Sequence, residues 1–299
     1  NGNMRRFAYL SVLSIILALG VQGCDSIQPN EPGTLVVEAF FNVGQPLPVV
    51  TVKQAAALNS LTESAVEATV SLMMQGQSFA YVRTSDPLRY APEDSEYVIP
   101  SGAAYQLTVS TEERTALVSG ITPQVISIDR ISVEVSKTPI FAVFVDTLNL
   151  GLDSLNLSLD ASQRFIYPVE VAIEWRGADV ADFNPWIESR LEPVTSFSSS
   201  IVDFFLLPSQ VFPESDTTPV DGNLHSWSGV YAVPVTEESS PLPDHELKIT
   251  LLRSDEQYAR FATSRNDPVR REPASNLQGA IGFVGAISVD SVRVTVSNQ

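Results

Sequence analysis

From Thr34 onwards the chain consists of short runs of β-branched and aromatic residues that are separated by turn residues. In "AYQLTVS" (residues 104–110) and "YPVEVAIEW" (residues 167–175), apolar side chains occupy every second position. Alternation with a period of two is typical of a strand that buries one face. Twenty prolines spread along the chain disfavour long helices, because proline removes a helical hydrogen bond. The sequence therefore predicts a mainly β (all-β) fold, with Trp175 in its core.

The turn residues divide the chain into two β units. About six strands are expected within residues 34–123, a density typical of an immunoglobulin-like or transthyretin-like β-sandwich. Pro123 closes this unit, and a second β-rich domain is expected over residues 124–299. Residues 177–228 are rich in Pro, Ser and Asp, so we expect long loops there.

One short helix is expected near residues 255–265, in the stretch "SDEQYARFATSR". Ser254 and Gln257 have the spacing of a capping box, which predicts that the helix begins after Ser254. Tyr258 and Phe261 lie on one face of this helix. Because a helix this short needs tertiary contacts to persist, we expect both rings to pack under a glycine-rich strand pair in "GAIGFVGAISV".

Residues 1–23 have the layout of a lipoprotein signal peptide, with residues 4–23 as the signal peptide proper. Two arginines after Met4 precede thirteen uncharged residues, "FAYLSVLSIILAL", a run shorter than the roughly 20 residues that span a bilayer. The next residues, "VQGC", resemble a bacterial lipobox, which ends in an acylated cysteine. We therefore expect lipidation, for example with palmitate, at Cys24, followed by a tether over residues 24–33. An ordinary secretory leader that happens to lie near Cys24 is the alternative.

The net charge of the chain is −17 at pH 7. Such a surface repels nucleic acids and anionic lipid headgroups, so we expect neither as a partner. Contact with the membrane is instead expected through the lipid on Cys24.

The sequence contains few residues of the types that catalytic sites use. It has one cysteine and two histidines, and it has neither a Gly-x-Ser-x-Gly nucleophile elbow nor a glycine-rich phosphate loop after a strand. His245 follows Asp244 and could bind a metal, but a solvated turn before a strand is the preferred interpretation. The acidic residues of "SDTTPVDGN" depart from the spacing of a calcium-binding loop, so a polar turn is expected there. We expect no catalytic, cofactor-binding or metal-binding residues and a protein that is not an enzyme.

Two tryptophans are candidates for contact with a ligand or a partner. Trp186 and Trp227 lie in the irregular stretch, where exposed aromatic rings can stack on sugars or on protein surfaces. Packing inside the fold is the alternative for both residues.

Three stretches together resemble an uncharacterised family of exported Bacteroidota lipoproteins, known as domain of unknown function four-two-four-nine. They are "LVVEAFFNVGQPLPVVTV", "SGAAYQLTVSTEERTALVSGITPQVISIDRI", and "LKITLLRSDEQYARFATS" followed by "EPASNLQGAIGFVGAISVDSV". The resemblance covers nearly all of residues 34–297, and residues 177–228 depart from it most. Genes of this family commonly lie beside TonB-dependent outer-membrane receptors, which implies a role in nutrient uptake. The family supplies no catalytic residues.

The leading hypothesis is a non-enzymatic lipoprotein anchored in the outer membrane, serving as an accessory ligand- or receptor-binding subunit of a TonB-dependent importer. Contact with the receptor is expected through residues 177–228. A carbohydrate-binding surface module that uses Trp186 or Trp227 is the first alternative. An anchored hydrolase is the second, because 35 acidic residues guarantee some chance carboxylate pairs. The sequence leaves open whether the protein faces the periplasm or the medium.

Overall fold

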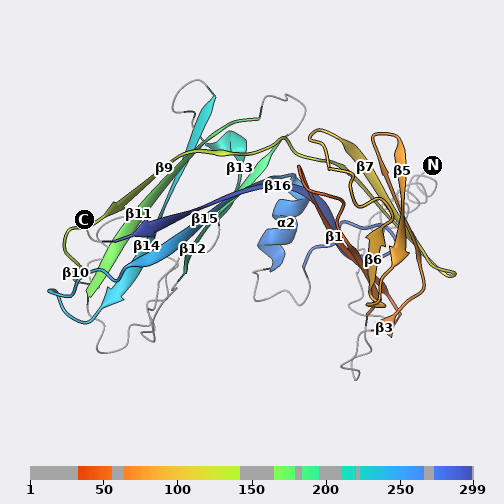
Figure 1. Ribbon diagram of the computed structural model, residues 1–299, viewed down its shortest axis with the longest axis horizontal. Helices are drawn as coiled ribbons and strands as arrows, with labels where there is room; N and C mark the ends of the chain where they lie inside the picture. Colours follow the sequence, from red (N-terminus) through yellow and green to blue (C-terminus); the bar gives the residue numbers. More distant parts are fainter. Residues whose placement is uncertain are drawn as a thin grey trace, which may run out of the picture.

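The computed structural model describes residues 33–55, 64–141, 165–178, 184–194, 210–217, 219, 223–265 and 273–297. These residues form sixteen strands, one short 3-10 helix and one α-helix, arranged as two neighbouring β lobes (Figure 1). The predicted mainly β fold is confirmed. The signal peptide, Cys24 and almost the whole tether lie outside the described residues.

The first eight strands form the first lobe, and they lie next to one another in a single sheet. They are β1 (Leu35–Asn42), β2 (Val50–Gln54), β3 (Ser64–Ala65), β4 (Thr69–Met74), β5 (Gln77–Arg83), β6 (Arg89–Pro92), β7 (Ala104–Ser110) and β8 (Thr115–Ile121). The order in the sheet is β1-β2-β6-β5-β4-β7-β8, with β3 beside β2. The turn between β4 and β5 uses Gln75 and Gly76, whose φ angles of 50° and 80° suit a tight hairpin.

The sheet of the first lobe curls around its own core. Every second residue of β1, β4 and β7 is buried in one cluster, although these strands lie at different places in the sheet. The ring centroids of Phe41 in β1 and Tyr105 in β7 are only 5.0 Å apart across this core. On the far side, Leu117 of β8 exchanges backbone hydrogen bonds of 3.0 and 2.9 Å with Gln278. The two halves of the sheet therefore face each other like the layers of a sandwich.

The second lobe is a sandwich of two sheets around a second core. One sheet contains β9 (Ile128–Val135), β10 (Ile140–Phe141), β11 (Phe165–Arg176) and β14 (Leu224–Val235). The other contains β12 (Trp186–Val194), β13 (Gln210–Pro213), β15 (His245–Ser254) and β16 (Ile281–Val296), and it is continuous with the sheet of the first lobe. Trp175 is fully buried between the two sheets, as the alternation in β11 predicts.

The last strand, β16, belongs to both lobes (Figure 1). Its residues 281–287 pair parallel with β1, and its residues 288–296 pair antiparallel with β15. The expected strand pair in "GAIGFVGAISV" is therefore wrong, because these residues run through one continuous strand. Gly282 does not turn the chain. It has a φ of 106°, and a Cβ at this position would lie 2.3 Å from the carbonyl oxygen of Val37.

The described parts of residues 177–228 contain more regular structure than the long loops that we expected. They hold β12, β13, a 3-10 helix (Glu214–Asp216) and the first residues of β14. Prolines inside these strands, such as Pro193 in β12, hide the alternation in the sequence. Neighbouring strands nevertheless pair with β12 on both sides.

The expected helix is present as α2 (Glu256–Arg265). Its N-cap is Asp255, whose Oδ1 accepts a hydrogen bond of 2.8 Å from the backbone N–H of Tyr258. The predicted cap, Ser254, is instead the last residue of β15. The predicted packing is confirmed, because Phe261 stacks on Phe283 of β16 with ring centroids 4.4 Å apart and Tyr258 is buried against the same ring.

The segment that joins the two lobes is fixed by side chains of the shared sheet. Ser288 accepts a hydrogen bond of 3.0 Å from the backbone N–H of Ile126, and Asp290 accepts one of 2.8 Å from that of Ile128. Arg253 donates to the carbonyl oxygen of Val125 at 2.9 Å. These contacts hold the lobes together in addition to the pairing along β16. Among the described residues, no helix has both the length and the apolar character that a bilayer crossing requires.

Candidate functional site

Both histidines are engaged in contacts inside the second lobe. His245 is buried at the start of β15, so the expected solvated turn is wrong. Its Nε2 lies 2.5 Å from the hydroxyl of Tyr231, and its Nδ1 lies 2.8 Å from the carbonyl oxygen of Pro243. Burial lowers the pKa of His245 below its ordinary value, although Pro243 and the nearby Asp244 act in the opposite direction. This arrangement suits a neutral imidazole with a structural role.

His225 in β14 also makes structural contacts. Its Nδ1 lies 2.5 Å from Oγ1 of Thr217, and its ring stacks on the buried indole of Trp175. The described part of the chain contains no group of three or more His, Cys, Asp or Glu side chains placed to bind a metal ion.

A buried ion pair lies between the 3-10 helix and β15. Arg253 Nη2 is 2.5 Å from Glu214 Oε1, and both side chains are almost fully buried. Glu214 also accepts a hydrogen bond of 2.7 Å from the indole Nε1 of Trp175, and Arg253 donates to the carbonyl oxygen of Arg176 at 2.7 Å. The charges therefore stabilise each other and the surrounding backbone, which is a structural use of both side chains.

A second buried carboxylate lies beneath α2. Glu188 of β12 accepts hydrogen bonds of 2.6 Å from Arg190 and 2.6 Å from the hydroxyl of Tyr258. Burial alone would raise the pKa of Glu188, but these two hydrogen bonds and the charge of Arg190 together lower it. Burial and the adjacent carboxylate raise the pKa of Tyr258. The cluster keeps Glu188 ionised and attaches α2 to β12.

Trp227 is committed to the packing of the second lobe. Its Nε1 donates a hydrogen bond of 2.8 Å to Oε1 of Gln210 in β13. Its ring also lies over Gly229, where a Cβ would be 2.2 Å from the indole. The side chain of Trp227 thus links β13 to β14.

Trp186 is one of the residues that line a surface groove. A pocket of about 390 Å³ lies between the first residue of β12 and one face of α2, and a second pocket of about 200 Å³ adjoins it along the helix. The two pockets share Arg260 and Ala274. We call the combined feature the α2 groove. Its lining residues are Trp186, Glu256, Gln257, Ala259, Arg260, Thr263, Ser264, Ala274, Ser275 and Asn276.

The polar groups of the α2 groove are paired with one another. Arg260 Nη2 is 2.5 Å from Glu256 Oε1 in an exposed ion pair. At the other end, Asn276 donates a hydrogen bond of 2.9 Å to Gln257 Oε1 and is held by the backbone of Val284. The groove therefore offers both donors and acceptors while its lining carries no net charge.

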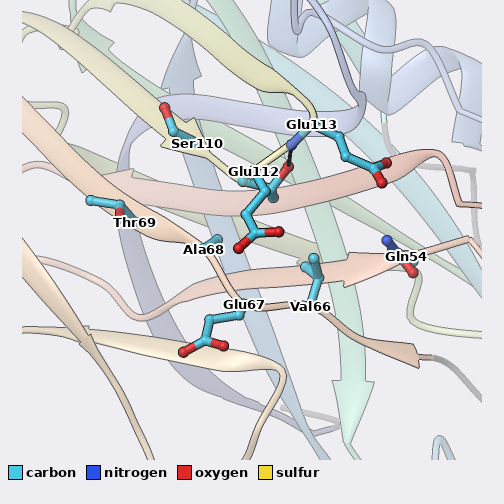
Figure 2. Close-up of a pocket in the computed structure, with 9 residues that line it drawn as sticks. Gln54, Val66, Glu67, Ala68, Thr69, Ser110, Glu112 and Glu113 are labelled. Carbon is cyan, nitrogen blue, oxygen red and sulfur yellow. Dashed lines mark hydrogen bonds between the residues drawn. The ribbon is translucent and has the colours of Figure 1, made fainter.

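A larger pocket of about 660 Å³ lies at the end of the first lobe (Figure 2). Glu67 precedes β4, whereas Glu112 and Glu113 belong to the turn between β7 and β8, and Figure 2 shows these three carboxylates around the pocket. All three glutamates are exposed, and no basic residue is among the residues that line the pocket. It is an open, acidic hollow in which these carboxylates are solvated.

Sequence reasoning missed the buried charged residues. Arg253 lies in phase with Leu247, Ile249 and Leu251, which all face the core of the second lobe. This phase is a signal that a charged side chain points inward and needs a partner. Its partner Glu214 lies in the irregular stretch, where no period in the sequence indicates its position.

Comparison with known proteins gives one match. A family model described as "Domain of unknown function (DUF4249)" matches residues 25–293. No curated protein and no solved structure matches the chain.

Proposed function

The chain belongs to the DUF4249 family, a family of unknown function, and on that premise we propose that it is a lipid-anchored binding protein of the cell envelope. In this proposal it is not an enzyme. It serves as an accessory ligand- or receptor-binding subunit of a TonB-dependent nutrient importer and resides in the outer membrane.

The observation that carries this proposal is the short stretch of chain between Cys24 and the first strand. Because β1 begins at Leu35, only about ten residues separate the lipid from the fold. An extended chain gains about 3.3–3.6 Å per residue, so the lipid would hold the fold within about 35 Å of the bilayer. Membrane proteins of the same bilayer therefore lie within reach of such a fold.

The buried carboxylates of the second lobe and of the contact beneath α2 support a binding role rather than a catalytic one. These carboxylates, Glu188 and Glu214, are neutralised by Arg190 and Arg253. A catalytic acid or base needs a pKa near the working pH and access to substrate. These four side chains instead form ion pairs with one another.

The anchor is tested by the variant Cys24→Ser, with Ser26→Ala as a matched control in the same tether. Each acyl chain contributes roughly 0.8 kcal/mol per buried methylene, so two or three chains give essentially permanent membrane attachment. The wild type and the control should label with an alkyne analogue of palmitate and sediment with the membranes. The Cys24→Ser variant should do neither. A mature wild-type protein without a lipid mass shift would contradict the proposal.

The partner is tested by purification of the tagged protein in mild detergent after crosslinking in cells. A TonB-dependent receptor should be recovered. Residues 208–228 are part of the stretch that is expected to contact the receptor, but their deletion would remove β13 and Glu214 and so disturb the fold. The exposed residues Ser215 and Asp216 can instead be replaced by arginine, which should weaken recovery of the receptor while the melting temperature stays unchanged. Recovery of the lipoprotein alone would overturn the proposed partnership.

A further inference from the structure

We propose that the α2 groove is a glycan-binding site in which Trp186 stacks against a neutral sugar ring. This inference deepens the proposed function by naming a ligand class, and it rests on that function only in treating the chain as a binding protein.

The surface that Trp186 offers to the groove is carbon. The residue is half-buried, and its indole Nε1 is buried without a hydrogen-bond partner among the described residues. The exposed part of the indole is therefore apolar and suited to stacking rather than to hydrogen bonding. The backbone of Trp186 is fixed in the sheet, because it lies opposite Pro213 of β13 on one side and Ser254 of β15 on the other.

The helix leaves room beside this indole. The α2 residues that line the pocket with Trp186 include Ala259 and Thr263, and Ala274, whose backbone N–H donates to Ser264, lines it as well. These short side chains leave a pocket of about 390 Å³, which lies within the range of about 300–1,000 Å³ that is usual for small-molecule sites. A longer side chain at the exposed position of Thr263 would fill it.

The polar groups of the α2 groove can form hydrogen bonds with the hydroxyl groups of a neutral sugar. Arg260 and Gln257 supply donors, and Glu256 supplies an acceptor. A sugar hydroxyl donates and accepts at once, so it can satisfy either kind of group. Because the opposite charges of Glu256 and Arg260 lie side by side and largely cancel, the groove attracts neither an anionic nor a cationic ligand strongly. Because the Glu256–Arg260 pair is exposed, breaking it on binding costs little.

The helix that forms one side of the α2 groove is fixed in place without a ligand. Tyr258 holds α2 to Glu188 through a hydrogen bond of 2.6 Å, and Phe261 stacks on Phe283. A site on a fixed helix loses little conformational entropy on binding. An apolar side chain of a peptide would also cover the indole of Trp186. It would not, however, use the donors and acceptors of the rim, where Arg260 pairs with Glu256 and Gln257 accepts a hydrogen bond from Asn276.

The test uses the full-length lipoprotein in detergent and isothermal titration calorimetry. The probes are four neutral hexasaccharides (α-1,4-glucan, β-1,4-glucan, β-1,4-xylan and β-1,4-mannan) and an acidic hexagalacturonate. We expect at least one neutral probe to bind and the acidic probe not to bind. Trp186→Ala should then weaken binding by at least about tenfold. Trp227→Phe, which changes a tryptophan outside the groove, should leave binding unchanged.

A second variant separates loss of the site from loss of the fold. Thr263→Trp removes no core side chain and fills the groove from an exposed helical position, so it should abolish binding without lowering the melting temperature. The inference is overturned if no neutral probe binds, if the acidic probe binds as well as the neutral ones, or if binding survives both Trp186→Ala and Thr263→Trp. It is also overturned if an aromatic-rich peptide binds the groove and no saccharide does. None of these results affects membrane attachment through Cys24, so the failure of this inference is distinguishable from failure of the anchor.

Discussion

Arg253 and Glu214 come from different parts of the chain and meet as a buried ion pair 2.5 Å apart. Removal of one partner leaves the other charge buried and unpaired. We therefore expect Glu214→Ala to lower the free energy of unfolding by about 3–5 kcal/mol in urea denaturation. The matched control is Glu192→Ala, which removes a carboxylate from an exposed pair with Lys248 and should cost less than about 1 kcal/mol. Equal losses would contradict the structural role of the buried pair.

The packing of α2 gives an order of effects for its aromatic contacts. Phe283 is almost fully buried, so Phe283→Ala should lower the free energy of unfolding by about 3–5 kcal/mol. Phe261 is only partly buried, so Phe261→Ala should lower it by less. Both values can be measured by chemical denaturation. A larger loss for Phe261→Ala would show that the helix contributes more to the core than its exposure indicates.

The two candidates for the N-cap of α2 can be separated by alanine substitution. Asp255→Ala removes the hydrogen bond to the backbone of Tyr258 and should destabilise the protein by about 0.5–2 kcal/mol. Ser254→Ala keeps that hydrogen bond and should cost less. A thermal melt of each variant measures the difference. A larger loss for Ser254→Ala than for Asp255→Ala would show that Ser254 is the N-cap, as the capping-box pattern predicts.

The stability of the protein should fall as the pH drops below about 6.5, the ordinary pKa of histidine. The pKa of His245 is lowered in the folded state, so the unfolded chain binds a proton more readily. The stability that neutral His245 contributes is therefore complete above pH 6.5 and is lost as the pH falls toward the folded pKa. Unfolding free energies at a series of pH values measure this loss. The variant His245→Gln should have a shallower slope, and an unchanged slope would assign the effect to other groups.

Gly282 lies in the part of β16 that pairs with β1, opposite Val37. A Cβ there would lie 2.3 Å from the carbonyl oxygen of Val37, so Gly282→Ala should separate the two strands. Gly44 has a comparable φ of 80° but open space around it, so Gly44→Ala should show only the cost of the left-handed conformation, about 1–2 kcal/mol. We expect the melting temperature to fall clearly further for Gly282→Ala than for Gly44→Ala. Similar melting temperatures would contradict the parallel pairing.

Local patterns predicted the features that depend on neighbouring residues. The alternation in β7 and β11 indicated their buried faces, and the face of α2 that carries Tyr258 and Phe261 was identified correctly. These features follow from the period of side chains along a strand or helix. The cap of α2 was misplaced by one residue, because Ser254 and Asp255 are both good N-cap residues.

Features that join distant residues could not be predicted in this way. The parallel pairing of β1 with β16 links residues more than two hundred positions apart, and no local period encodes it. The glycines of β16 suggested a hairpin, although Gly282 serves a close approach between strands. The α2 groove also escaped prediction, since it forms only where Trp186 meets a helix that lies far along the chain.

The shared strand has a consequence for the timing of folding. The first lobe takes its strands from the beginning of the chain, but Val284 and Ala286 of β16 complete its core. A ribosome must therefore finish almost the whole polypeptide before this core can close, and contacts of such long range form slowly. A polypeptide that remains incompletely folded until its synthesis ends is a suitable substrate for a secretion channel that passes extended chains. In this way the position of one strand would favour export before folding over folding in the compartment of synthesis.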